Sequence, residues 1–227
     1  MNGEKIEFSK TISIKNEYIF FKRILYGISK RIFDIFFGVI GCLILVPVLV
    51  IVKIVYVING DYESILLIQK RIGQNGQIFN FYKIRTMVSN AEKILLDLLE
   101  NDKNIAEQYR INKKIKNDPR ITKIGKILRK KSIDEFPQFI NILKGNMSLI
   151  GNRPYLLSEK EDMGIYYNEI IKTKPGLTGI WQVNGRNNTT FQKRLELESK
   201  YSNSYSLKKD IKIFFKTVKV LLFTNAQ

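Results

Sequence analysis

An uninterrupted apolar run near the N-terminus constrains this chain more than any other feature. Residues 35–52 carry no charge and are almost all apolar, in the sequence IFFGVIGCLILVPVLVIV. At about 1.5 Å per residue, a helix of this length reaches roughly 27 Å, close to the ~30 Å hydrocarbon core of a bilayer. The run begins far from Met1 and no small-residue cleavage site follows it, which argues against a signal peptide. The run therefore predicts a membrane segment.

The path of this segment through the membrane has two interpretations. Pro47 lies inside the run, where a proline removes a backbone hydrogen bond and predicts a kink. Basic residues flank both ends, namely Lys22, Arg23, Lys30 and Arg31 before the run and Lys53, Lys70 and Arg71 after it. Positive residues prefer the cytoplasmic side, so a straight span would place one basic flank on the wrong side. Charge alone leaves a kinked helix that returns to its own side and a tilted single span equally open.

The strongly basic composition narrows the partners and the chemistry. Lysine and arginine number 38 against 21 aspartate and glutamate, which gives a formal net charge of +17. This balance suits phosphate groups, nucleic acid or an anionic membrane face. The single cysteine, Cys42, lies in the apolar run, so no internal disulfide can form and a reducing compartment is predicted. No histidine occurs, so catalysis would rest on carboxylate, lysine, arginine or tyrosine side chains and an oxygen-bound cation.

The remaining pattern predicts an α+β fold, a mostly helical single domain with a small β-hairpin. The domain is expected over residues 61–227, after an N-terminal segment of residues 1–60. Asn75-Gly76 would form the tip of the hairpin within residues 64–87. Helical spacing of apolar residues predicts helices over residues 90–116, 121–131, 155–174, 190–201 and 205–223. Lysines between the apolar positions of the last helix favour a membrane-interface helix over a helix that only covers the core.

Two adjacent carboxylates, Asp134 and Glu135, directly follow a run of positive charge. The run ends the basic helix of residues 121–131, whose core-facing residues are expected to be Ile124, Ile127 and Leu128. Ser132 to Glu135 match a capping box, in which Ser132 caps a new helix and Glu135 reaches back to its backbone amide. On this interpretation the carboxylates are a structural detail of a helix start.

The same residues also suit a functional site. The amides at a helix start bind phosphate oxygens and keep a nearby carboxylate ionised. Cationic side chains at Arg129, Lys130, Lys131 and Arg153 could hold that charge and neutralise an approaching phosphate. Pro137, inside the expected helix, indicates an unusual local backbone.

Three long stretches resemble the bacterial sugar transferases, the monotopic phosphoglycosyl transferases that load a sugar phosphate onto a polyprenyl phosphate carrier. They are NDPRITKIGKILRKKSIDEFPQFINILKGNMSLIGNRPY, KPGLTGIWQVNGR and DIKIFFKTVKVLL, and the resemblance runs from about Lys30 to Leu222. It implies UDP-sugar and polyprenyl phosphate as substrates and a domain on the cytoplasmic face of the bacterial inner membrane. It also implies a re-entrant membrane helix, about 33–57, broken at Pro47. The sequence leaves open whether the protein forms a homo-oligomer.

The resemblance further implies roles for particular residues. Asp134 matches the nucleophile that attacks the sugar-linked phosphate and expels UMP, and Glu135 matches its acidic partner. Both are implied as ligands of Mg²⁺. Basic residues at active-site or substrate-binding positions of the family are Lys83, Arg85, Arg129, Arg153 and Arg186. Phosphoryl transfer needs positioning and charge neutralisation more than proton transfer, so a chain without histidine can perform it.

Two departures from the family pattern and one insertion bear on the function. Asn146 and Asn152 stand where the family usually has aspartate and proline, which puts any cation contact at Asn146 in doubt. Residues 90–116 resemble the hexose-1-phosphate subgroup, which favours UDP-glucose or UDP-galactose over N-acetylated sugars. Because of Asn146 and Asn152, an inactive scaffold subunit remains an alternative interpretation. A membrane-tethered nucleic-acid binder would also explain the charge, but no RNA-recognition or helix-turn-helix pattern occurs, so no nucleic-acid partner is expected.

Overall fold

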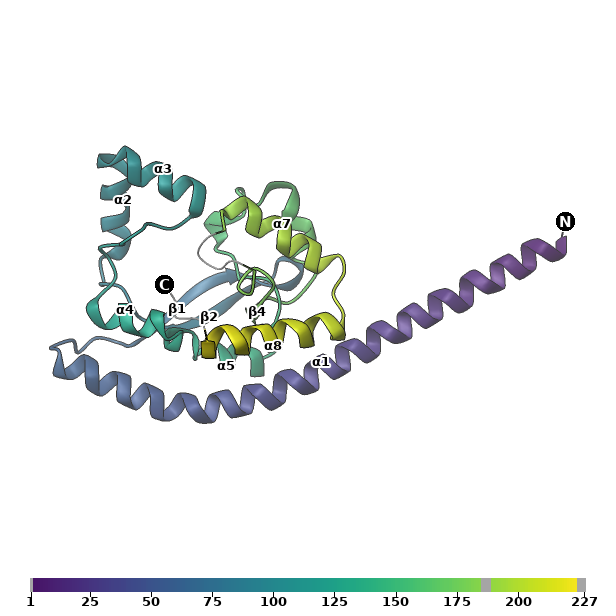
Figure 1. Cartoon of the computed structure of the whole chain (residues 1–227), viewed down its shortest axis with the longest axis horizontal. Coiled ribbons are helices and arrows are strands. Elements are labelled where there is room, and N and C mark those ends of the chain that lie inside the picture. Colours follow the sequence, from purple (N-terminus) through teal and green to yellow (C-terminus); the bar gives the residue numbers. More distant parts are fainter. Residues whose placement is uncertain (1, 185–188, 224–227) are drawn as a thin grey trace.

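One long helix carries the whole apolar run. The computed structural model of the chain describes residues 2–184 and 189–223, and its first element is α1 (Asn2–Ile58). In the part of α1 whose side chains are described, Phe20–Ile58 is long and apolar enough to cross a membrane. Figure 1 shows α1 extending away from the rest of the molecule at its N-terminal end and curving beneath it at its C-terminal end. The predicted helix is therefore present and is longer than residues 33–57.

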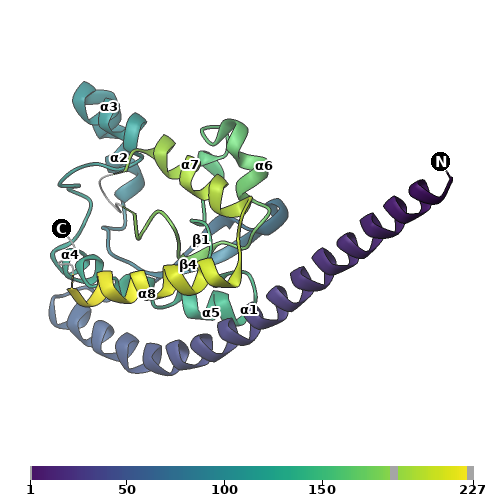
Figure 2. The ribbon, with the colours of Figure 1, turned by 45° about the vertical axis from the view of Figure 1, so that its right-hand side comes forward.

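The expected break at Pro47 is replaced by continuous helix. α1 passes through Pro47 without interruption, and its curvature is visible in both views (Figures 1 and 2). The turns around and after the proline are held against the domain, because Val48, Val52 and Tyr56 pack with Ile84. This packing keeps the chain helical where the missing hydrogen bond would favour a break. The re-entrant path through a membrane stays a prediction.

The domain covers only one stripe of α1. Its buried positions recur every three or four residues, at Asp34, Gly38, Gly41, Leu45, Val52 and Tyr56. Large apolar side chains on the other faces are exposed, among them Leu43 at 69% and Val46 at 65%. A folded protein rarely leaves so continuous an apolar surface in water. The exposed face is that of a helix suited to lie in a membrane.

Polar contacts also join α1 to the domain. Lys30 Nζ lies 2.6 Å from Asp210 Oδ2 and donates a second hydrogen bond to the Ile150 carbonyl oxygen at 2.8 Å. The buried Asp34 carboxylate accepts hydrogen bonds from the Ser148 hydroxyl and the Leu149 amide. These contacts lie before the apolar run, whereas the packing of Tyr56 against Ile84 lies after it. The domain therefore contacts α1 at both ends of the run.

The predicted hairpin is confirmed. Strands β1 (Leu66–Ile72) and β2 (Ile78–Ile84) pair antiparallel, and a 3-10 turn at Gln74–Gly76 joins them. Asn75 adopts φ 54°, a left-handed conformation that asparagine tolerates in such turns. Phe79 and Phe81 of β2 point into the main core with Ile142, Leu149 and Ile150. The hairpin thus forms one wall of the domain.

Four of the segments that were predicted to be helical are helical in the structure. The segment of residues 90–116 forms α2 (Ala91–Asn101) and α3 (Lys103–Asn112), divided where the Asp102 side chain accepts from two amides of α3. The basic helix is α4 (Lys123–Lys130), α7 spans Phe191–Ser202, and α8 spans Leu207–Phe223. Within α4, Ile124 and Leu128 face the core, but the expectation for Ile127 is wrong because it is 63% exposed.

The region after residue 147 differs most from the prediction. Strands β3 (Ser148–Ile150) and β4 (Gly176–Thr178) pair in parallel, which was not expected from the sequence. Residues 155–174, predicted helical, contain only the short α6 (Tyr167–Ile170) and the 3-10 turns η3 (Leu157–Glu159) and η4 (Gly164–Tyr166). Tyr155 is buried and its carbonyl accepts the Ile72 amide, which holds this segment extended against the hairpin.

Candidate active site

The carboxylate pair lies in a turn between two helices. Asp134 and Glu135 belong to the 3-10 turn η2 (Ile133–Glu135), and α5 begins only at Gln138 (Gln138–Leu143). The predicted capping box is wrong, because Ser132 is left-handed, with φ 55°, and its side chain makes no cap hydrogen bond. Pro137 sits at the N-cap of α5, where its fixed φ and missing amide are tolerated. The sharp path from α4 through Ser132 directs Asp134 inward.

Asp134 is a buried carboxylate with a close cationic partner. It is 3% exposed, and its Oδ2 lies 2.7 Å from the Nζ of Lys83 on β2. Glu135 beside it is half-buried. The structure therefore brings Lys83 and Asp134 into contact, as a shared site requires. Opposite charges at this distance attract each other and give Asp134 a defined orientation.

Arg129 provides a second positive charge near the pair. Its Nε donates to the Thr86 hydroxyl at 2.9 Å, which fixes the side chain against the end of the hairpin. Burial lowers the pKa of the Arg129 guanidinium below its usual value, and the nearby charges of Asp134 and Asp118 oppose that shift. Arg129 therefore faces the carboxylate from the last turn of α4.

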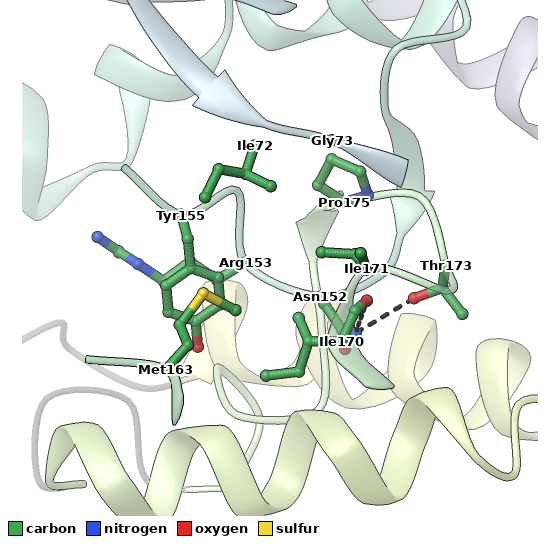
Figure 3. Close-up of a pocket in the computed structure, with 10 residues that line it drawn as sticks. All are labelled: Ile72, Gly73, Asn152, Arg153, Tyr155, Met163, Ile170, Ile171, Thr173 and Pro175. Atoms are coloured by element: carbon green, nitrogen blue, oxygen red, sulfur yellow. Dashed lines mark hydrogen bonds between the residues drawn. The ribbon is translucent and has the colours of Figure 1, made fainter. Parts of the chain in front are cut away.

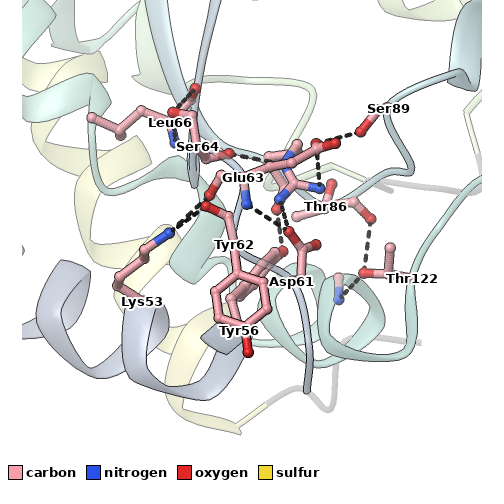
Figure 4. Close-up of polar contacts among 12 residues, drawn as sticks. Lys53, Tyr56, Asp61, Tyr62, Glu63, Ser64, Leu66, Thr86, Ser89 and Thr122 are labelled. Carbon is pink, nitrogen blue, oxygen red and sulfur yellow. Dashed lines mark hydrogen bonds and ion pairs between the residues drawn. The ribbon is translucent and has the colours of Figure 1, made fainter. Parts of the chain in front are cut away.

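Arg85 has a different environment. Its guanidinium donates to Asp61 Oδ1 at 2.7 Å and to the Ser64 carbonyl at 2.8 Å, and it lies over the Tyr56 ring (Figure 4). The hydrogen bond from Arg85 lowers the pKa of Asp61. These contacts brace the linker between α1 and β1. The suggested substrate-binding role of Arg85 gains no support from this geometry.

Arg153 lies in the segment that follows β3. Its backbone amide donates to Glu198 Oε1 at 2.7 Å, and its guanidinium lies 3.7 Å from Glu159 Oε1. Figure 3 shows Arg153 beside the Tyr155 ring at one end of a small cavity. The charges of Arg153 and Arg129 both act on Lys114, which follows α3. Lys114 is thus within electrostatic reach of both arginines.

Lys114 and Arg194 are basic residues that the sequence interpretation did not single out. Burial first, then the charges of Arg194 and Arg153, lowers the pKa of Lys114 to about 8, against the opposing charge of Glu135. Arg194 is only 1% exposed although it stands in a helix rich in charge. Lys114 lies among other lysines and Arg194 among alternating acids and bases, so neither is distinguished by its local pattern.

The two asparagines that depart from the family pattern occupy unlike positions. Asn152 is buried, and its amide nitrogen donates to the Ile170 carbonyl, the Thr173 hydroxyl and the Ser202 hydroxyl. It therefore joins β3 to α6 and α7. Asn146 is exposed at the rim of an open, polar depression that is also lined by Lys70 and Lys144. Arg186 lies outside the described residues.

Few groups of possible metal ligands occur in the described part of the chain. Among residues 2–184 and 189–223 there is no group of three or more such side chains able to hold a metal. Mg²⁺ is often bound by only one or two carboxylates together with substrate phosphates. Asp134 and Glu135 supply that smaller set of oxygen ligands, so the residues fit a cation shared with a phosphate substrate.

These features define a class of protein. A helix with an exposed apolar face suits a membrane, and the domain docked on it carries a buried carboxylate among basic side chains. Such a protein is membrane-associated and has a site for anions. The chain belongs to the bacterial sugar transferase family, because residues 25–224 match the family described as "Bacterial sugar transferase".

Several curated relatives share substantial identity with the chain. It is 42% identical over 222 residues to the galactosyl transferase CpsE of Streptococcus agalactiae serotype III, covering 97% of this chain and 48% of that protein. It is 39% identical over 193 residues to the undecaprenyl-phosphate galactose phosphotransferase of Salmonella typhimurium, covering 85% and 40%. It is 38% identical over 192 residues to the exopolysaccharide production protein ExoY of Sinorhizobium fredii, covering 85% and 84%. The chain thus spans half or less of the first two relatives and most of the third.

Proposed function

We propose that this protein transfers a sugar 1-phosphate from a UDP-sugar to a polyprenyl phosphate, at the cytoplasmic face of the inner membrane. The observation that carries the proposal is the buried Asp134 carboxylate paired with Lys83 at 2.7 Å. A carboxylate held between cations can receive a phosphate group without strong repulsion, because Lys83 and Arg129 offset the added negative charge. Membership of the sugar transferase family supports the choice of phosphate substrates.

The position of the turn supports a lipid acceptor. Ile133, directly before Asp134, packs in a cluster with Val52 and Tyr56 of α1. The reactive carboxylate is therefore next to the helix that we place in the membrane. A polyprenyl phosphate anchored by its hydrocarbon chain would present its head group at that level. The name of the Salmonella relative, an undecaprenyl-phosphate galactose phosphotransferase, agrees with such an acceptor.

The proposed reaction has two steps. In the first, an Asp134 carboxylate oxygen attacks the sugar-linked phosphorus, the bond from that phosphorus to the UMP oxygen breaks, and UMP leaves. In the second, a phosphate oxygen of the lipid attacks the same phosphorus and the Asp134 carboxylate is released. Splitting one transfer into two in this way is the general advantage of a covalent nucleophile. Lys83 orients the Asp134 carboxylate before attack.

We further propose that the protein requires Mg²⁺, which Glu135 and Asp134 would hold together with substrate phosphate oxygens. When bound, the cation would neutralise charge on the phosphates. The half-buried position of Glu135 beside the buried Asp134 supports a division of roles, with the more accessible carboxylate nearer the cation. Arg129 contributes fixed positive charge to the same region.

The test is turnover by the purified full chain in detergent or nanodiscs. UDP-galactose is the first donor, since two of the relatives above are named for galactose transfer, and UDP-glucose is the second. With Mg²⁺ and undecaprenyl phosphate we expect release of UMP, and with donor alone we expect a sugar-phosphate adduct on the protein. Asp134→Asn should abolish both signals. An adduct that persists in Asp134→Asn would show that another residue is the nucleophile, and wild-type protein without UMP release would reject the function.

A further inference from the structure

A second group of basic side chains lies beside the carboxylate pair. It comprises Lys114 after α3, Arg153 after β3 and Arg194 on α7, and we call it the triad of cations. Arg194 Cζ lies 4.7 Å and Lys114 Nζ lies 5.5 Å from the centre of the Trp181 ring. The charges of Arg194, Arg153 and Glu135 all act on Lys114. Lys114 and Arg194, which are distant in sequence, thus meet at the Trp181 ring, whereas Arg153 lies over the Tyr155 ring.

Several donors in this group are buried without an acceptor. Within the described part of the chain, Arg153 Nε, Arg194 Nε and Trp181 Nε1 have no hydrogen-bond partner. The whole Arg194 residue is 1% exposed and Trp181 is 8% exposed. Leaving buried donors unsatisfied costs free energy, so native proteins rarely gather them without a ligand or water. These three atoms are donors, and two acceptors on the adjacent residues, Asn152 Oδ1 and Gln182 Oε1, are also buried without a partner among the described residues. The three donors suit a ligand with several oxygens.

The nearby acids do not neutralise the triad of cations. Glu198 is buried and accepts from the Arg153 amide and the Tyr155 hydroxyl, and burial raises its pKa to about 7. Glu159 accepts the Leu156 amide and lies 3.7 Å from Arg153, longer than a charged hydrogen bond. The Arg153 guanidinium is therefore only weakly paired with Glu159 and could be contacted by an anion. The low pKa of Lys114 agrees with mutual repulsion that an anion would relieve.

The location of the triad of cations distinguishes between a lipid phosphate and a nucleotide phosphate as its ligand. α3 and α7 lie in contact with each other, on the side of the domain opposite α1 in both ribbon views (Figures 1 and 2). A lipid phosphate must approach from the α1 side, whereas a water-soluble nucleotide can enter from the α3 and α7 side. The triad of cations therefore suits the soluble donor. Glu135, whose charge acts on Lys114, connects it to the site of phosphate transfer.

We infer that Lys114 and Arg194, together with Arg153, bind the phosphate of the nucleotide half of the sugar donor, with Trp181 as the wall of that subsite. This inference rests on the proposed function, because it assigns one part of the UDP-sugar to one part of the same site. The buried donors would hydrogen-bond the nucleotide phosphate oxygens, and the sugar-linked phosphorus would lie toward Asp134.

The experiment compares variants of the full chain in nanodiscs. Lys114→Ala is the main variant, and Lys116→Ala is the matched control, since Lys116 is exposed, lies two residues away and loses the same charge. Calorimetry measures UMP binding, and initial rates give KM for UDP-galactose and for undecaprenyl phosphate separately. We expect Lys114→Ala to weaken UMP binding and raise KM for UDP-galactose about tenfold, the effect of one lost charged hydrogen bond. Lys116→Ala should match wild type.

Arg194 needs a milder change, because Arg194→Ala would leave a large void in the fold. Arg194→Lys keeps the charge and removes the planar donor group, and we expect it to weaken UMP binding about tenfold with an unchanged KM for undecaprenyl phosphate. Unchanged UMP affinity in both Lys114→Ala and Arg194→Lys, with turnover still abolished by Asp134→Asn, would overturn the inference and leave the proposed function intact. A raised KM for undecaprenyl phosphate alone would assign the triad of cations to the lipid and also overturn it. Wild-type UMP binding without any turnover would reject the proposed function instead.

Discussion

At the scale of single residues, the Lys83–Asp134 ion pair sets the direction in which the Asp134 carboxylate points. Asp134 is almost fully buried, whereas about a quarter of the Lys83 side chain is exposed, at 24%. Removing the cation would leave a buried carboxylate without its closest partner. Removing both charges would restore neutrality. The pair can therefore be tested through stability as well as through activity.

We expect Lys83→Met to destabilise the protein by about 2 kcal/mol at neutral pH, less than for a fully buried pair because Lys83 is partly exposed. Lys83→Met combined with Asp134→Asn should recover most of that loss. The measurement is the unfolding midpoint of the full chain in detergent. Lys70→Met, on the exposed face of the neighbouring strand, is the control and should change little. An unchanged midpoint in Lys83→Met would mean that the ion pair contributes nothing to stability.

The pKa of Lys114 predicts a pH dependence for donor binding. Burial first, then the charges of Arg194 and Arg153, lowers this pKa to about 8, while Glu135 opposes the shift and Arg129 adds to it. Because the protonated amine is the form that binds an anion, donor affinity is full below about pH 8 and falls as pH rises above it. We expect KM for UDP-galactose to rise about fivefold between pH 7.5 and pH 8.5–9, measured by initial rates.

Lys114→Arg provides the control for this pH effect. Arginine stays protonated over the whole range, so KM in that variant should stay level as pH increases. A rise of the same size in Lys114→Arg would place the titrating group elsewhere. The charged groups facing Lys114 from α7 and from the segment after β3 are Arg194 and Arg153, and both are unaltered in this comparison.

At the scale of secondary-structure elements, α1 and α5 approach closely because glycines face the contact. A Cβ atom built on Gly41 would overlap the Phe139 ring, and one on Gly38 would press against Leu143. Gly27, earlier in the same helix, has open space around it. The short α5 carries the turn that holds Asp134, so the position of α1 bears on the position of the site.

Gly41→Ala should therefore separate α1 from α5. We expect a loss of about 1–3 kcal/mol in stability, as for other overpacked contacts, and a lower kcat because η2 shifts with α5. Gly27→Ala is the matched control, and it should be neutral or slightly stabilising, since alanine favours helix more than glycine does. The measurements are the unfolding midpoint and the rate of UMP release. Equal behaviour of the two variants would show that the α1–α5 contact can relax.

The elements that the sequence predicted correctly are those whose pattern is local. The hairpin followed from Asn75-Gly76 between apolar strands, and α7 from the helical spacing of its apolar residues. In the structure Thr190 caps α7 by accepting the Lys193 amide. The β3–β4 pair was missed because its short strands are far apart in sequence and pair through a close approach of Gly151 and Gly176. The prediction of a helix over residues 155–174 was wrong, because tertiary contacts to Ile72 and Glu198 hold Tyr155 in place.

The candidate site divides in the same way. Asp134 and Lys83 were named from the resemblance, and the structure brings them together, with Arg129 close by. Arg85 was named with them, yet acids in the linker after α1 engage its guanidinium. Lys114 and Arg194 were missed because only folding places them beside Trp181. Contacts between distant segments decide which basic residues belong to the site.

At the scale of the whole molecule, the domain holds α1 on both sides of its apolar run. Asp210 of α8 accepts from Lys30 at 2.6 Å and from Tyr26 at 2.8 Å, before the run. Tyr56 and Val52 pack with Ile84 and Leu128 at its other end. A helix crossing the bilayer perpendicularly would carry one of these contact regions, and the polar domain attached to it, into or across the hydrocarbon. The two sets of contacts are compatible only if both flanks stay on the domain's side.

We therefore predict that labels before residue 35 and after residue 53 are reached from the same side of the membrane. Cys42→Ser removes the native thiol, and single cysteines are then placed at the exposed Lys22 and Tyr62. With a membrane-impermeant maleimide, both should react in inverted inner-membrane vesicles and neither in intact spheroplasts, because the domain contacts keep both flanks together. Labelling of one site from each side would establish a true span. In that case the Lys30–Asp210 contact must break in the membrane, and Lys30→Met would leave stability and turnover unchanged.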